Sequence, residues 1–151
     1  MIKALKQFFD DQLSQDQDDR PRDHDLQVAT AAMLFEVSRS DHQTSARERE
    51  KITRLVKRQF QLGEHEAAVL LDLAEQEVHD STSLHGFVTL INKNWTEQQR
   101  LELVEYMWQV AYVDEQLDDH EVHLMRKVQR LLYIPHKKFI GAKLRARDGD
   151  L

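Results

Sequence analysis

Apolar residues recur along this chain at the spacing of α-helices almost throughout. Between residues 26 and 37 they lie on nearly every side of the predicted helix, which is typical of a helix surrounded by others, and residues 101–111 show the same pattern. The segments 46–60 and 119–132 carry apolar residues mainly on one face. No segment shows the alternation of apolar and polar residues that is typical of a half-buried strand. The pattern therefore predicts an all-α fold, a compact bundle of about seven to eight helices.

Short motifs mark where several of these helices begin and end. Three pairs have the spacing of a capping box: Ser45 with Glu48, Thr96 with Gln99, and Asp118 with Glu121. Gly63 is predicted to end the helix that Ser45 begins, because glycine commonly follows the last helical residue. Pro135 is predicted to be the first residue of the final helix, where its missing N–H group costs nothing.

The chain divides into three parts. Residues 1–22 have apolar positions at helical spacing followed by a polar run, so we expect an N-terminal amphipathic helix and a surface linker. Residues 23–147 carry the remaining helices and are numerous enough to bury one autonomous core without disulfides or a structural metal. Residues 148–151 are a short tail.

Within the helical domain, residues 26–62 align with residues 99–135 at a constant offset of 73 positions. Polar identities gather around the turn between the two helices of each unit: Asp41 with Asp114, Gln43 with Gln116, and Glu48 with Glu121. Apolar pairs keep helical spacing on either side: Leu34 with Met107, Phe35 with Trp108, Val37 with Val110, Ile52 with Met125, Leu55 with Val128, and Phe60 with Tyr133. The alignment predicts a pseudo-repeat of two helical hairpins.

The recurring acidic residues are the candidate site. If the two hairpins pack face to face, Asp41, Glu48, Asp114 and Glu121 converge, and four neighbouring carboxylates must either raise their pKa values or bind a cation. Because the ligands are all oxygen atoms, Mg²⁺, Ca²⁺ or Mn²⁺ is favoured over Zn²⁺. The alternative is purely structural: each Glu stabilises the start of its helix, and each Asp bonds its own backbone in a turn.

These residues also carry a resemblance to a known family. An apolar, alanine-containing helix, then Asp41 or Asp114, then a Glu seven residues further on resembles the repeat of the TerB-like (tellurite-resistance protein B) family. The C-terminal stretch YIPHKKFIGAKLRA is similar to the end of the uncharacterised bacterial branch of that family. The resemblance extends from about Leu26 onward and implies a compact helical domain whose acidic residues bind divalent cations. It also implies a role in tellurite or other stress resistance, with no established enzymatic reaction.

The chain departs from the family pattern at one position in each repeat. The family places Gly directly after the Asp, whereas this chain has His42 and Glu115 there. A left-handed backbone is less favourable for these residues than for Gly, so the departure puts a family-like metal geometry in doubt.

Charge and composition exclude several classes of function. With 21 basic and 27 acidic residues the net charge is −6, which argues against binding the phosphate backbone of nucleic acids. The chain has no cysteine, and we find no signal peptide and no apolar run of transmembrane length, so we expect a cytoplasmic protein. The basic segment 137–147 is expected to dock on the bundle through Phe139, Ile140 and Leu144, with weak contact to a membrane surface as the alternative.

Catalytic and standard metal motifs are missing. His120 and His123 are three residues apart, whereas a zincin helix requires a spacing of four, so we expect both to be solvated. Asp114, Gln116 and Asp118 resemble the start of an EF-hand loop, but that loop requires a Gly and a Glu further on that this chain lacks. We therefore expect a non-enzymatic protein and keep metal-assisted hydrolysis as the least favoured alternative.

Taken together, the residues and the resemblance predict a TerB-like helical module. It would bind a divalent cation through its carboxylate cluster and act by contacting partner proteins in a stress response. The alternative is a metal-free helical interaction scaffold in which the acidic residues only cap helices.

Overall fold

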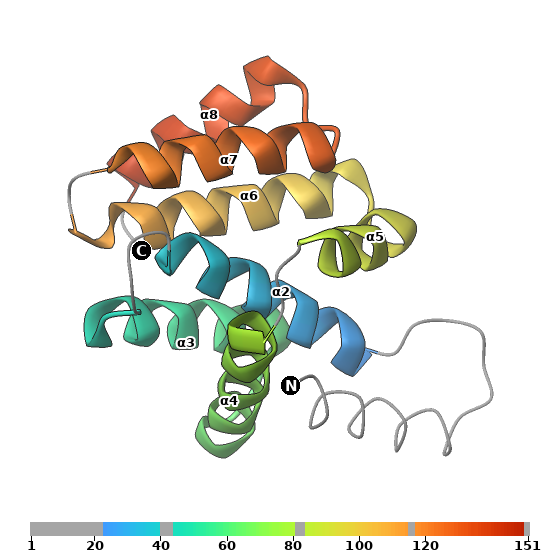
Figure 1. Cartoon of the computed structure of the whole chain (residues 1–151), viewed down its shortest axis with the longest axis vertical. Helices are drawn as coiled ribbons and strands as arrows, with labels where there is room; N and C mark the ends of the chain where they lie inside the picture. The colour runs from blue at the N-terminus through green and yellow to red at the C-terminus, as the bar shows by residue number, and fades with distance from the viewer. Residues whose placement is uncertain (1–22, 40–43, 81–83, 115–116, 150–151) are drawn as a thin grey trace.

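The structure of the chain is a computed structural model that describes residues 23–39, 44–80, 84–114 and 117–149 (Figure 1). Within these ranges every regular element is a helix: α2 (Asp23–Ser38), α3 (Ala46–Phe60), α4 (Glu64–Asp80), α5 (His85–Asn94), α6 (Glu97–Ala111), the 3₁₀-helix η1 (Tyr112–Asp114), α7 (Asp119–Leu131) and α8 (His136–Asp148). The predicted all-α fold is confirmed. The N-terminal helix predicted within residues 1–22 lies outside the described residues.

Helix α2 forms the centre of the bundle. Every residue from Val28 to Phe35 is at most 2% exposed, and α2 contacts α3, α4, α5, α6 and α7. The one polar residue in this stretch is Thr30, whose hydroxyl donates a hydrogen bond to the carbonyl of Leu26 at 2.7 Å. The buried hydroxyl group is therefore hydrogen-bonded. The all-round apolar pattern of the sequence is thus explained by neighbours on all sides.

Helix α6 is the second buried helix and connects α2 to the C-terminal part of the chain. It contacts α2, α3, α7 and α8, and its Trp108 is 1% exposed. The Trp108 ring packs against Phe139 of α8, with ring centroids 5.4 Å apart. Helix α8 docks on α6 as predicted, with Phe139 buried and Ile140 partly buried against the core, and Ala142 and Ala146 are buried beside them. The prediction for Leu144 is wrong: this residue is 42% exposed, because it lies about 140° around the helix from Phe139.

The three predicted capping boxes are confirmed. In each, the cap side chain accepts from the backbone N–H of the third helical residue, whose side chain accepts from the backbone N–H of the cap. Donor–acceptor distances in the three boxes lie between 2.8 and 3.2 Å. The sequence motif therefore locates the starts of α3, α6 and α7 correctly.

Two other predicted helix boundaries need correction. Helix α3 ends at Phe60, and Gln61 adopts the left-handed conformation that was expected at Gly63. Gly63 instead precedes α4, where its N–H donates to Glu66 Oε1 at 3.1 Å. Pro135 precedes α8 as its cap, and the helix begins one residue later.

The two predicted hairpins, α2 with α3 and α6 with α7, contact each other reciprocally. Helix α2 packs on α6, α3 contacts α6, and α7 contacts α2. Most of the aligned apolar pairs are buried alike, but Phe60 packs against the core whereas Tyr133 is 74% exposed. The pairing of these two residues is wrong because α7 is shorter than α3, with 13 against 15 residues.

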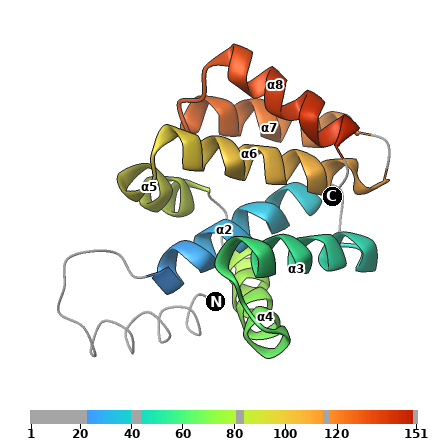
Figure 2. The same ribbon diagram turned by 180° about the vertical axis from the view of Figure 1, so that it is seen from behind.

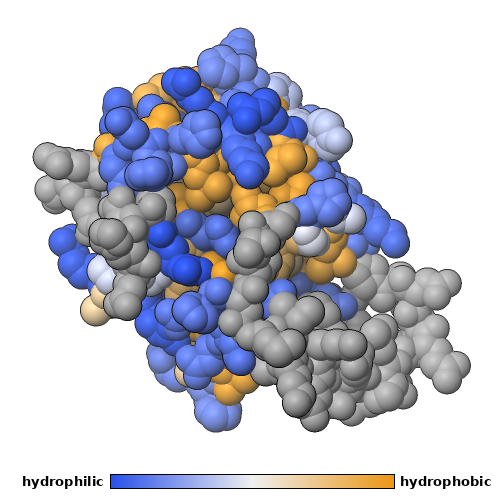
Figure 3. Space-filling view, in the orientation of Figure 1, coloured by the Kyte–Doolittle hydropathy of each residue, from blue (hydrophilic) through white to orange (hydrophobic). Residues whose placement is uncertain are grey.

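On the face seen in Figure 3, the surface is mostly hydrophilic over α7 and α8, and hydrophobic residues reach it between α5, α6 and α7. Helices α3 and α7 begin on the same side of the molecule, as the two opposite views show (Figures 1 and 2). On that side, η1 lies between the two helix starts along the vertical axis of the views. None of the helices in the described ranges combines the length and the apolar character needed to cross a membrane.

Candidate functional site at the starts of two helices

Glu48 and Glu121 occupy equivalent positions in the two hairpins. Each is the third residue of its helix, and they are 5% and 6% exposed. Oε1 of Glu48 accepts the backbone N–H of Ser45 at 2.9 Å, and Oε1 of Glu121 accepts that of Asp118 at 3.1 Å. The recurrence of these residues in the sequence therefore corresponds to a recurrence of burial and hydrogen bonding.

The connection between α2 and α3 is held at both ends. The hydroxyl groups of Ser38, at the end of α2, and Thr44, before the cap of α3, form a hydrogen bond of 2.6 Å. Ser38 is buried and also donates to the carbonyl of Phe35 at 2.9 Å. These bonds fix where α3 begins relative to the central helix.

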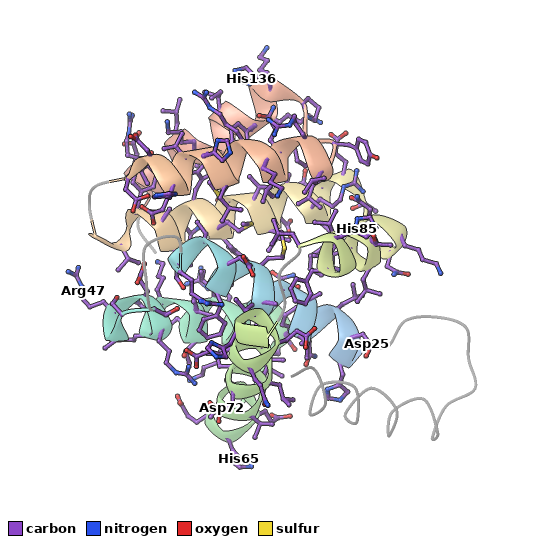
Figure 4. All side chains as sticks on the ribbon, viewed as in Figure 1. Asp25, Arg47, His65, Asp72, His85 and His136 are labelled. Atoms are coloured by element: carbon purple, nitrogen blue, oxygen red, sulfur yellow. The ribbon has the colours of Figure 1, made fainter. Side chains whose placement is uncertain are left out.

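One side chain joins the two repeats at this end of the molecule. The guanidinium of Arg47, in the first turn of α3, donates to the carbonyl of Val113 in η1 at 3.2 Å. Figure 4 shows Arg47 extending outward from the start of α3. No local sequence pattern identifies Arg47 as a contact between the repeats, because its acceptor lies 66 positions away.

Of the four predicted ligands, the side chains of Glu48 and Glu121 are described by the structure, and those of Asp41 and Asp114 are not. Asp41 lies outside the described residues. Asp114 ends η1, and its side chain lies outside the described part of the structure. Across residues 23–39, 44–80, 84–114 and 117–149, no three His, Asp or Glu side chains are grouped so that they could hold a metal ion.

Capping explains why a residue with a side-chain acceptor stands at positions 48 and 121, but not why it is buried, since Gln99 makes the same capping bond while exposed. The third capping box, at the start of α6, has the same hydrogen bonds with Gln99 in place of Glu, so the motif does not require a charge. A cation site at these helices would therefore depend on Asp41 and Asp114. His120 and His123 are exposed on α7, as expected for solvated histidines.

Comparison with known proteins agrees with the architecture. The family model described as Tellurite resistance protein TerB matches residues 27–144, which includes both hairpins, α8 through Leu144 and the connecting helices α4 and α5. Searches of curated proteins and of solved structures gave no match. The resemblance seen in the repeats is confirmed, and the chain belongs to the TerB family.

Proposed function

We propose that this TerB-family chain is a non-enzymatic helical module that holds a divalent cation and contacts partner proteins at the end where α3 and α7 begin. The hydrogen bond between Arg47 and Val113 is the observation that carries the proposal. It brings the start of one repeat against the turn of the other, which is the arrangement that a site shared between Asp41, Glu48, Asp114 and Glu121 requires. Oxygen ligands of this kind suit Mg²⁺, Ca²⁺ or Mn²⁺.

A metal-free interaction scaffold is the second candidate, and a specific observation favours it. Glu48 and Glu121 each make a capping hydrogen bond, and this role requires no ligand. In this case the carboxylates near the starts of α3 and α7 would bind basic partners by charge alone, and that binding would weaken as the salt concentration rises.

Thermal melting distinguishes the two candidates. The full chain is treated with a chelator and then melted alone and with Mg²⁺, Ca²⁺, Mn²⁺ or Zn²⁺ added back. A cation at 100 times its Kd should stabilise the fold by about 2.7 kcal/mol. The variant Asp41→Asn/Asp114→Asn should lose this shift, whereas the control Asp119→Asn, an exposed residue in the first turn of α7, should keep it.

Each outcome decides one part of the proposal. If no ion shifts the melting temperature, or if the double variant keeps the full shift, the cation site is wrong. In that case a protein that co-purifies with the chain, is unaffected by chelator and is released by high salt would support the metal-free scaffold.

A further inference from the structure

A basic cavity lies at the end of the molecule where α3 begins, and its described lining includes Arg47 and Val113 but none of the four predicted carboxylates. Its volume is about 340 Å³, and it lies between α3, the junction of α6 with η1, and the end of α8. Arg47, Lys51 and Arg54 line it from α3, and Arg147 lines it from α8. We propose that this cavity binds a phosphate monoester, as part of a small soluble molecule that also carries hydroxyl groups.

The three α3 cations form one face of that helix. They are separated by four and three residues, which places them on the same side. None of the ion pairs among the described residues involves Arg47, Lys51 or Arg54. Arg49, on a different face of the same helix, is paired with Glu75 at 2.5 Å and Asp72 at 2.9 Å. The cation of α3 that points toward α4 is thus paired with carboxylates, whereas the three cations that line the cavity form no ion pair with a described carboxylate.

The environment of Lys51 favours an anion. Burial lowers the pKa of its ammonium group, and the neighbouring positive charges of Arg54 and Arg58 lower it further. A bound anion would relieve this repulsion. Arg47 is held in place by the carbonyl of Val113, and its guanidinium has further N–H donors for a ligand oxygen.

A second, independent observation comes from the floor of the cavity. Gln109 lines it, is 4% exposed, and its Oε1 has no hydrogen-bond partner among the described residues. Buried amide groups are normally satisfied, and α6 is otherwise apolar on this buried stretch. This oxygen is covered in the free protein, so a ligand hydroxyl group would donate to it after the Gln109 amide turns toward the cavity. Glu50 at the cavity wall is a second acceptor for such a hydroxyl.

Charge and size identify the ligand class. Among the described residues that line the cavity, the three α3 cations face one carboxylate, Glu50, and Arg147 is paired with Asp148, which leaves two positive charges to neutralise. A phosphate monoester carries about −1.5 to −2 charges at neutral pH. The cavity is at the lower end of the range for small-molecule sites, about 300–1,000 Å³. A small phosphorylated molecule therefore matches it better than an extended polyanion, which the net charge of −6 would also repel.

Calorimetric titration of the full chain tests the proposal. The probes are inorganic phosphate, glucose 6-phosphate and AMP, with glucose and adenosine as partners that lack the phosphate. Titrations are run with chelator present, so that the result does not depend on the proposed cation site. A phosphate monoester should bind with 1:1 stoichiometry, and more tightly than inorganic phosphate, because Gln109 and Glu50 contact only the organic part.

Variants locate the site. Lys51→Gln and Arg54→Gln should each weaken monoester binding at least about tenfold, because each removes a charge-assisted hydrogen bond. The control Arg126→Gln removes the same charge from an exposed residue of α7 that is outside the cavity lining, and should bind normally. Lys51→Gln should also raise the melting temperature of the free protein, since it removes a desolvated charge, so that lost binding cannot be attributed to misfolding.

The proposal is overturned if neither monoester binds, if adenosine or glucose binds as tightly as its phosphorylated partner, or if Arg126→Gln weakens binding as much as Lys51→Gln. Vesicles containing phosphatidylinositol 4-phosphate provide the remaining arm. Binding to these vesicles without binding to either soluble monoester would assign the cavity to a lipid headgroup and refute a soluble ligand.

Discussion

Replacing Glu48 and Glu121 separates the charge of these residues from their capping role. The change to Gln keeps a side-chain oxygen that can accept the cap N–H and removes the charge, whereas the change to Ala removes both. Gln99 already makes this hydrogen bond at the start of α6, with Thr96 N–H donating to its Oε1 at 2.9 Å. We therefore expect Glu48→Gln and Glu121→Gln to fold with little loss of stability in the presence of a chelator.

The magnitude for Ala follows from the geometry. Each Glu is at least 94% buried and accepts a backbone hydrogen bond of 2.9 or 3.1 Å with a charged oxygen. Hydrogen bonds to charged groups contribute roughly 1.5–3 kcal/mol, so each Ala variant should lose about 2 kcal/mol of unfolding free energy. For a chain of this length that corresponds to a decrease in Tm of roughly 4–8 °C.

Urea unfolding provides the assay, with tryptophan fluorescence from the buried Trp108 and the partly buried Trp95 as the signal. The same variants melted with Mg²⁺, Ca²⁺ or Mn²⁺ then test the cation separately, because Gln cannot replace a carboxylate in balancing the charge of the ion. If Gln costs as much stability as Ala without metal, the charge itself stabilises these helix starts and capping is not a sufficient explanation.

Three further predictions concern the rest of the bundle. The pKa of Glu36 is raised, mainly by burial, so Glu36→Gln should stabilise the protein at about pH 7. This gain should disappear at about pH 3, where the wild-type carboxyl group is protonated in both the folded and the unfolded state. Melting curves at both pH values check this, and an equal gain at the two pH values would contradict it. Tyr133 is exposed and has a left-handed backbone with φ +56°, a conformation that costs free energy for every residue except Gly. In urea unfolding, Tyr133→Gly should therefore raise the unfolding free energy by about 0.5–1 kcal/mol, whereas Tyr133→Ala should not. Equal effects of the two changes would show that the backbone conformation is not the cause. Trp108→Ala should cost about 3–5 kcal/mol by the same measurement with circular dichroism as the signal, because it leaves a cavity against Phe139; a loss below 1 kcal/mol would mean that the core closes around it.

The elements of the fold were largely predictable because their signals are local. Capping boxes depend on residues three positions apart, and they located the starts of α3, α6 and α7. The central positions of α2 and α6 followed from apolar residues on all their sides. The end of α3 was predicted incorrectly because Gln61, and not the nearby Gly63, adopts the left-handed conformation. Glycine usually occupies this position after a helix, but packing can override that preference.

The candidate site was predictable only in part. The repeat correctly identified Glu48 and Glu121 as equivalent residues, because equivalent burial preserves residue type at a fixed offset. It did not identify Arg47, Lys51 or Arg54, although their spacing along one helix face is visible in the sequence. That face looks like an ordinary solvated surface until Gln109 and Arg147 are placed opposite it.

The sequence by itself thus determined the helices, their caps, the two buried helices and the membership of a family, because these depend on neighbours along the chain and on periodic burial. The tertiary structure alone decided which helix ends meet. Arg47 reaches Val113 across 66 positions, and α3, α6, η1 and α8 line an open basic cavity in an acidic chain. Contacts of this kind depend on how the helices pack in three dimensions, and no local pattern encodes that packing.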